Sequence, residues 1–158
     1  MNFVMRIMPV LLILSSAACH VTGTGTQAAA ARSGPVPLEI KTAAGVRSFR
    51  VEVARTPEEQ ERGLMFRTSL PEDGGMIFPI AVPREASFWM KNTVISLDMI
   101  FIRSDGTIAR IADNTIPYDL TPVSSGEPVT AVLELAGGKA AALGIAEGDR
   151  VIWKSTAQ

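Results

Sequence analysis

The chain from Leu38 onward consists largely of short stretches in which apolar and polar residues alternate, separated by turn signals. Alternation with a period of two indicates strands that bury one face. Many short strands with frequent turns pack as a β-sandwich or barrel, so the sequence predicts a mostly β domain of that kind. Ser104-Asp105-Gly106 predicts a tight turn, and hence the clearest hairpin of the chain. The expected strands lie around residues 38–40, 49–53, 76–78, 87–90, 97–102, 107–111, 129–135 and 151–153.

Two short helices interrupt this pattern. Thr56 can cap a helix that has Pro57 in its first turn, and Glu59 completes a capping box with Thr56. A second helix is expected over residues 139–143, where Gly144 is placed to end it. We therefore expect one β domain with one or two minor helices.

The N-terminal segment has the composition of an export signal. Arg6 is the only charged residue among residues 1–18, and an apolar run follows it and ends on small residues. This run is too short to span a bilayer as a stable anchor, so it predicts a signal peptide. Residues 19–35 are poor in large apolar side chains and predict a flexible linker, leaving 36–158 for the β domain. We expect an exported protein, in the periplasm or at the cell envelope.

Cys19 is the single cysteine of the chain, so no intramolecular disulfide can form. It follows Ser16-Ala17-Ala18, which resembles the processing site of a bacterial lipoprotein, where the cysteine is lipidated. The alternative is cleavage by ordinary signal peptidase, at Ala18 or within residues 28–30. Membrane contact is expected only through a lipid anchor at Cys19.

The charge balance argues against nucleic acid as a partner. The formal net charge is −1, with 15 basic and 16 acidic residues. Binding to a phosphate backbone needs an excess of Lys and Arg on one face, and the composition supplies no such excess.

A series of short motifs resembles domain-of-unknown-function family 192, a group of small, mostly bacterial and archaeal proteins that often carry export signals. The resemblance extends from about Leu38 to Trp153, with Ser96 standing where the family often has proline. It implies a compact β-sandwich-like domain and no particular activity. The motifs, in chain order, are Gly63-Leu64-Met65-Phe66-Arg67, Gly75-Met76-Ile77-Phe78, Phe88-Trp89-Met90-Lys91-Asn92-Thr93, Leu97-Asp98-Met99-Ile100-Phe101, Leu133-Glu134-Leu135 and Gly148-Asp149.

Polar residues within these motifs form the candidate binding site. Asp98 lies in an otherwise apolar strand and needs a partner, which Arg67 or Lys91 would supply. One interpretation is a pocket for a small anionic or carbohydrate ligand, in which Trp89 offers a flat apolar face. The other is a buried ion-pair network that fixes strand register. The candidate residues are Arg67, Trp89, Lys91, Asn92, Thr93, Asp98 and Glu134.

Metal and cofactor sites are not expected. Met65, Met76, Met90 and Met99 are soft ligands for Cu(I), but they lack close Met-x-Met spacing, and the only histidine, His20, is in the linker. Packing in the core is the favoured role of these methionines.

Two functional classes remain open at this point. The leading hypothesis is a non-enzymatic ligand-binding or accessory domain of the cell envelope. The alternative is a small envelope enzyme acting on a carbohydrate or anionic substrate, with Asp98 or Glu134 as acid or base. Within the β domain, no histidine or cysteine is present to act as base or nucleophile.

Overall fold

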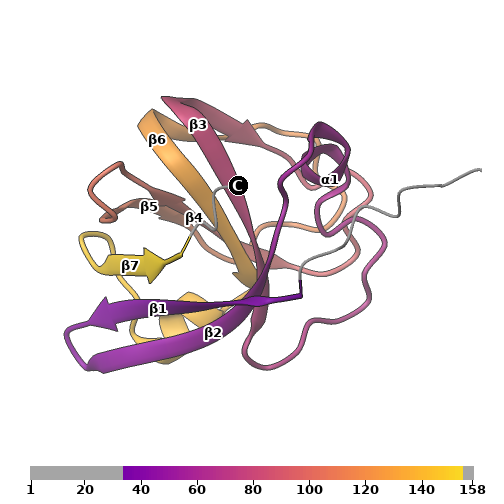
Figure 1. Ribbon diagram of the computed structural model, residues 1–158. Coiled ribbons are helices and arrows are strands. Elements are labelled where there is room, and N and C mark those ends of the chain that lie inside the picture. The colour runs from indigo at the N-terminus through magenta and orange to yellow at the C-terminus, as the bar shows by residue number, and fades with distance from the viewer. Residues whose placement is uncertain (1–33, 155–158) are drawn as a thin grey trace, which may run out of the picture. The chain divides into compact units, whose positions relative to one another are not determined.

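The computed structural model describes residues 34–154, and within them a seven-stranded sheet curls into a half-barrel (Figure 1). The prediction of a mostly β domain is confirmed. Along the sheet the strand order is β5-β4-β6-β3-β2-β1-β7. The strands are β1 (Val36–Thr42), β2 (Gly45–Val53), β3 (Gly74–Phe88), β4 (Leu97–Ile102), β5 (Ile108–Ala112), β6 (Val123–Ala136) and β7 (Arg150–Trp153).

Neighbouring strands pair antiparallel, except for β2 and β3, which are parallel over Arg50–Val53 and Gly74–Ile77. The two outer strands of the order approach each other, because a single bridge joins Thr107, just before β5, to Arg150 of β7. This bridge curls the sheet at one end and leaves the other end open.

The central strands β3, β4 and β6 are buried on both faces. Alternate residues of a strand point to opposite sides, so each of these strands contributes to two hydrophobic clusters. Ile77, Ile100 and Leu133 lie in the cluster inside the curl. Their neighbours Phe78, Phe101 and Val132 lie in a second cluster on the other face. Burial on both faces explains why Leu97–Ile102 is apolar without alternation.

Both expected helices are present. Helix α1 (Pro57–Arg62) begins with the capping box, since Glu59 donates its backbone N–H to the Thr56 hydroxyl and accepts from the Thr56 N–H. Helix α2 (Lys139–Leu143) ends at Gly144, which adopts a left-handed conformation. Neither helix of the described region is long and apolar enough to cross a membrane.

One prediction about the strands is wrong. Residues 76–78 and 87–90 were expected in two separate strands, but a single strand, β3, spans 74–88. It pairs with β6 along its length, with register shifts between Pro79 and Arg84 and again after Glu85. These irregularities let a strand containing two prolines stay in the sheet.

The expected signal peptide (1–18), Cys19 and nearly all of the linker (19–35) lie outside the described residues.

Candidate functional site

Asp98 lies on β4 and is fully buried. Its carboxylate accepts three backbone N–H groups: from Asn114 and Gly138 at 2.8 Å each on one oxygen, and from Ala140 at 2.7 Å on the other. The expectation that Arg67 or Lys91 pairs with Asp98 is therefore wrong. Main-chain donors satisfy the carboxylate instead, and it ties the first turn of α2 and the loop after β5 to the sheet.

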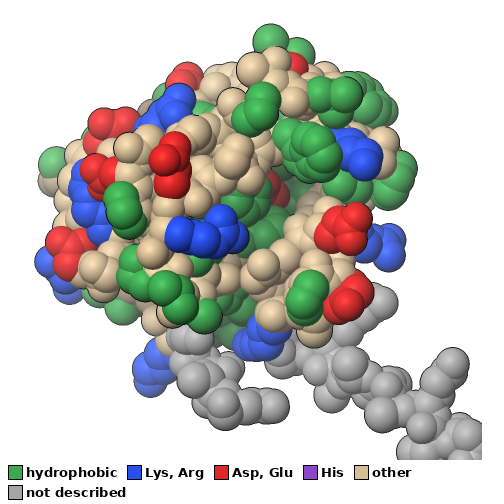
Figure 2. All heavy atoms as spheres, turned by 90° about the horizontal axis from the view of Figure 1, so that it is seen from above, with side chains coloured by type: hydrophobic (Ala, Val, Ile, Leu, Met, Phe, Trp, Pro, Cys, Tyr) green, Lys and Arg blue, Asp and Glu red, His purple; other side chains and the backbone are tan. Residues whose placement is uncertain are grey.

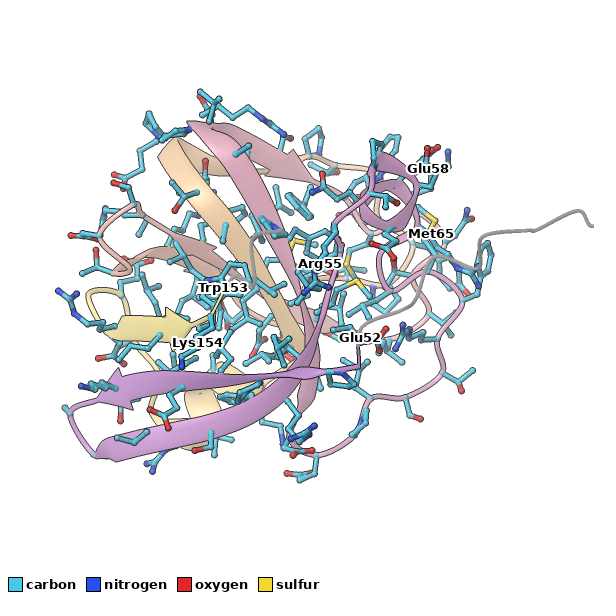
Figure 3. All side chains as sticks on the ribbon, in the orientation of Figure 1. Glu52, Arg55, Glu58, Met65, Trp153 and Lys154 are labelled. Carbon is cyan, nitrogen blue, oxygen red and sulfur yellow. The ribbon has the colours of Figure 1, made fainter. Side chains whose placement is uncertain are left out.

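Arg67 also lies apart from the expected cluster. Its guanidinium makes two parallel hydrogen bonds to the carboxylate of Glu52 on β2, at 2.5 and 2.7 Å. The hydrogen bond to Glu52 raises the pKa of Arg67. About a third of the Arg67 side chain is exposed, so this bridge is partly screened by solvent. Figure 3 labels Glu52, which lies on β2 close to the crossing with β3.

The remaining acid of the predicted set, Glu134, lies at a pocket of about 200 Å³. Residues of α1 and the loop after it, of β3 and of the loop after β3 line this pocket together with Glu134. Figure 3 labels one of them, Met65, just beyond α1. Viewed from above, the molecule is hollowed between hydrophobic side chains, with acidic surface visible at depth and basic side chains beside the opening (Figure 2).

Glu134 comes from the centre of the sheet. On β6 it is paired with Met76 of β3 and Met99 of β4, so its side chain leaves the sheet on the face of the second cluster. The neighbouring strand is held close at this point. A Cβ on Gly75 would lie 2.5 Å from the carbonyl oxygen of Glu134, so only glycine fits there.

The carboxyl group of Glu134 has no side-chain or backbone partner within residues 34–154, and the residue is only 5% exposed. Burial alone raises its pKa from 4.5 to about 8, because desolvation penalises the charged form. No side-chain oxygen of the described region is both fully enclosed and unpartnered, so the Glu134 oxygens reach the open space of the pocket.

Three other predicted residues line the same pocket: Trp89, Lys91 and Thr93. The Lys91 ammonium lies 5.2 Å from the centre of the Trp89 ring, within the range of a cation–π contact. The Thr93 hydroxyl donates to the carbonyl oxygen of Lys91 at 3.2 Å, which fixes the turn at this wall. The structure thus brings together four of the seven predicted residues, and Arg67, Asn92 and Asp98 are not among the residues that line the pocket.

Asn92 supports the wall of the pocket from behind. Its φ is 53°, its carbonyl oxygen accepts from the Phe66 N–H at 2.9 Å, and its amide lies 3.8 Å from the Met65 sulfur. After glycine, asparagine is among the residues that adopt this left-handed conformation most readily. The hydrogen bond between Asn92 and Phe66 joins the loop after β3 to the loop after α1.

Sequence reasoning missed the other polar residues of the pocket. Arg62 and Arg84 are exposed basic residues, Gln60 belongs to α1, and Ser87 belongs to β3. They come from segments that show no functional pattern, and only the fold places them beside Glu134. With Lys91, the two arginines give the pocket lining three basic side chains, and none of them offsets the burial that raises the pKa of Glu134.

A larger hollow of about 1120 Å³ occupies the open end of the half-barrel. Arg55, after β2, and Trp153, at the end of β7, are two of its lining residues (Figure 3). Its arginines are already engaged: Arg103 pairs with Glu127, and Arg150 donates to the carbonyl oxygen of Asp105 at 3.0 Å. The smaller pocket is the stronger candidate because it holds the acid without a partner.

The chemistry of the smaller pocket follows from its single acid. At neutral pH a group with a pKa near 8 is mostly protonated and can both donate and accept a hydrogen bond. Glu134 is the only carboxyl group among the residues that line this pocket, so the carboxylate pair used by most glycosidases is incomplete there. Within the described residues, no three His, Cys, Asp or Glu side chains are grouped as metal ligands would be.

The fold and this pocket define a small half-barrel domain with one recessed acid on the outer face of its central strands. The model of domain-of-unknown-function family 192, described as "Uncharacterized ACR", matches residues 39–153, and the chain belongs to this family. A comparison with curated proteins finds no match.

Two solved structures are similar to this chain. One is a protein of unknown function from Novosphingobium aromaticivorans, which is 50% identical to this chain and has a TM-score of 0.74. The match covers 75% of this chain and 85% of that protein. The other, from Sinorhizobium meliloti, is described as a candidate transcription regulator. It is 41% identical, with a TM-score of 0.73, and the match covers 75% of this chain and 92% of its own.

Proposed function

We propose that this protein is an exported ligand-binding domain of the cell envelope, and that it holds a small anionic or hydroxylated molecule in the Glu134 pocket. The observation that carries the proposal is the buried carboxyl group of Glu134, which faces the pocket without a partner. A nearly buried carboxyl group without a protein partner makes the fold less stable whenever it is charged. A group retained at such a cost is a candidate for a function that the fold itself does not need.

The charges around the pocket indicate which molecules it favours. Arg62, Arg84 and Lys91 line it, and Glu134 adds little negative charge at neutral pH. Positive side chains around a neutral acid favour a ligand with an anionic group and disfavour a cation. Protonated Glu134 would bind a hydroxyl or carboxylate oxygen of the ligand, and Trp89 would cover its apolar part.

A charge series tests this proposal. We would titrate the full chain at pH 6.5 with benzoate, benzyl alcohol and benzylamine, following the Trp89 indole N–H and the Thr93 amide by NMR. Benzoate and benzyl alcohol are expected to shift both signals, and benzylamine at least tenfold more weakly. Replacing Glu134 with leucine should weaken benzyl alcohol binding about tenfold, whereas Glu39→Gln, at an exposed position of β1, should leave it unchanged. Equal binding of all three compounds, or binding unaffected by Glu134→Leu, would contradict the proposal.

The second candidate is a small envelope enzyme with Glu134 as general acid. The observation in its favour is the raised pKa, since a carboxylic acid that stays protonated near pH 7 is suited to protonate a leaving group. Hydrolysis of chromogenic glycosides and esters by the full chain, with Glu134→Gln as the control, tests it. Turnover that survives in Glu134→Gln would remove Glu134 from any mechanism.

A further inference from the structure

Exposed hydrophobic side chains gather on three loops beside the Glu134 pocket. These loops follow α1, β3 and β5. They carry six of the nine large hydrophobic residues that are exposed in the described region, among them the single tyrosine of the chain. Isolated exposed hydrophobic residues are ordinary, but a grouped set marks a binding surface. The six, which we call the loop patch, are Phe66, Trp89, Val94, Ile116, Tyr118 and Leu120.

Main-chain hydrogen bonds hold the three loops against one another. The Phe66 N–H donates to the carbonyl oxygen of Asn92 at 2.9 Å, and the Tyr118 N–H donates to that of Thr93 at 3.2 Å. The Met90 N–H donates to the carbonyl oxygen of Asp119 at 2.9 Å. The loop patch is therefore one connected surface, and it includes Trp89 at the wall of the pocket.

Two aromatic residues of the patch are themselves in the left-handed conformation. Phe66 has φ of 64° and Tyr118 has φ of 63°, and their rings are 66% and 59% exposed. All four non-glycine residues of the described region with positive φ lie on these three loops. Bulky residues rarely adopt this conformation, which costs about 1–3 kcal/mol. The backbone thus presents aromatic rings to the solvent at a cost to stability.

We infer that the ligand of the Glu134 pocket is the end of a negatively charged glycan, a chain of sugars that carry carboxylate groups. This inference rests on the proposed function and names its ligand class. The pocket, at about 200 Å³, is smaller than the sites of about 300–1,000 Å³ that enclose larger ligands, so it takes one sugar ring. The following sugars would lie over the Trp89 and Tyr118 rings, whose exposed faces suit the apolar face of a sugar.

Charge placement favours an acidic glycan over a neutral one. The Lys91 ammonium lies 5.2 Å from the centre of the Trp89 ring, so it would lie close to the carboxylate of a sugar that binds at the edge or on the other face of this ring. Arg62 and Arg84 line the same pocket and would attract the carboxylate of the terminal sugar.

A lipid surface fits the loop patch less well than a glycan does. Asp119 belongs to the same loop as Tyr118 and Leu120, and hydrogen bonds from Thr121 lower its pKa, so it stays ionised. An ionised carboxylate in this loop opposes insertion into an anionic bilayer, whereas it can accept hydrogen bonds from the hydroxyl groups of a sugar. The patch also adjoins a pocket with an unpartnered acid, and a bilayer would leave that acid unused.

The test compares chain length and charge. We would measure binding of galacturonate, its trimer, a mannuronate trimer and the fully methyl-esterified galacturonate trimer to the full chain at pH 6.5 by calorimetry. At least one acidic trimer is expected to bind tenfold or more tightly than the monomer and the neutral ester. Trp89→Ala combined with Tyr118→Asn removes both rings on which the sugars would lie, and asparagine at position 118 tolerates the left-handed backbone. This variant should bind the trimer no better than the monomer, and Val46→Asn, an exposed position outside the patch, should bind it normally.

Other results would overturn the inference. If both acidic trimers bind no tighter than galacturonate, or if the variant that lacks the Trp89 and Tyr118 rings binds them as tightly as the wild type, the loop patch does not bind glycan. If phosphatidylglycerol vesicles bind in a ring-dependent way and the trimers do not, the patch contacts lipid. The proposed function survives these results provided that the Trp89 and Thr93 signals still respond to benzoate. If neither the Trp89 nor the Thr93 signal responds to benzoate or to galacturonate, both the proposed function and this inference are contradicted.

Discussion

Asp98 and Glu134 lie one residue apart across paired strands, since Asp98 of β4 faces Leu135 of β6, and Met99 faces Glu134. Both acids are buried, yet three backbone N–H groups satisfy the first and no group satisfies the second. Strand alternation sends their side chains to opposite faces of the sheet. Asp98 therefore reaches the amide groups around α2, and Glu134 reaches a pocket. The contrast shows that a buried acid can have a structural or a functional role, and that the role depends on whether its face of the sheet supplies hydrogen-bond donors or a pocket.

The largest expected effect on stability comes from removing the hydrogen bonds that the Asp98 carboxylate accepts. Asp98→Asn replaces an acceptor with an NH₂ group that must face backbone donors, so at least one of the three N–H groups loses its partner. We expect the free energy of unfolding to fall by about 3–5 kcal/mol, because hydrogen bonds to a charged group contribute about 1.5–3 kcal/mol each and a buried N–H left without a partner adds its desolvation cost. Urea denaturation at pH 7 measures this, with Asp113→Asn on the adjacent exposed segment as the control. A loss below about 1 kcal/mol would mean that the tie is dispensable.

Glu134→Gln is expected to act in the opposite direction. Because the folded-state pKa of Glu134 is raised to about 8 from 4.5, the folded protein binds more protons than the unfolded chain between these values. Its stability therefore falls as pH rises from about 5 to 8. Removing the ionisable group should stabilise the protein by roughly 4 kcal/mol at pH 8 and by less than about 1 kcal/mol at pH 5.

The pH dependence of this difference is the decisive feature. We would record urea denaturation of the wild type and of Glu134→Gln at pH 5, 6, 7 and 8. A gap between the two proteins that stays constant with pH would show that folding does not change the pKa of Glu134. Glu39→Gln serves as the matched exposed control.

The smallest effect is expected at the partly exposed bridge between Arg67 and Glu52. A bidentate pair of this exposure contributes roughly 0–1 kcal/mol, so Arg67→Met and Glu52→Gln should each change the free energy of unfolding by no more than about 1 kcal/mol. A double-mutant cycle in urea isolates the coupling between them. A coupling above about 2 kcal/mol would place this pair with Asp98 as a structural tie.

Local signals in the sequence predicted much of the fold. The capping box of Thr56 and Glu59, the turn around Gly106 and the glycine end of α2 all depend on residues within a few positions of one another. The continuity of β3 was missed because the segment between residues 78 and 87, with Pro79 and Pro83, shows no strand pattern of its own, and pairing with the distant β6 keeps it in the sheet.

The candidate site was harder to predict, for a physical reason. Leu97-Asp98-Met99 and Leu133-Glu134-Leu135 are the same pattern in the sequence, an acid between apolar neighbours. What separates them is long-range: the amide groups that satisfy Asp98 come from up to 42 residues away. The loops that enclose Glu134 meet only in the folded chain. Trp89, Lys91 and Thr93 were found because one continuous motif carries them to a single wall.

The proposed function rests on the raised pKa of Glu134, and titration of this group in the folded protein tests it directly. Carboxyl-detected ¹³C NMR of the full chain, with Glu134→Gln used to assign the signal, measures its midpoint. We predict a midpoint of about 8, well above the ordinary 4.5, because burial without a partner disfavours the carboxylate. A midpoint near 4.5 would contradict the account, since it would show that the group is solvated or paired like any surface acid.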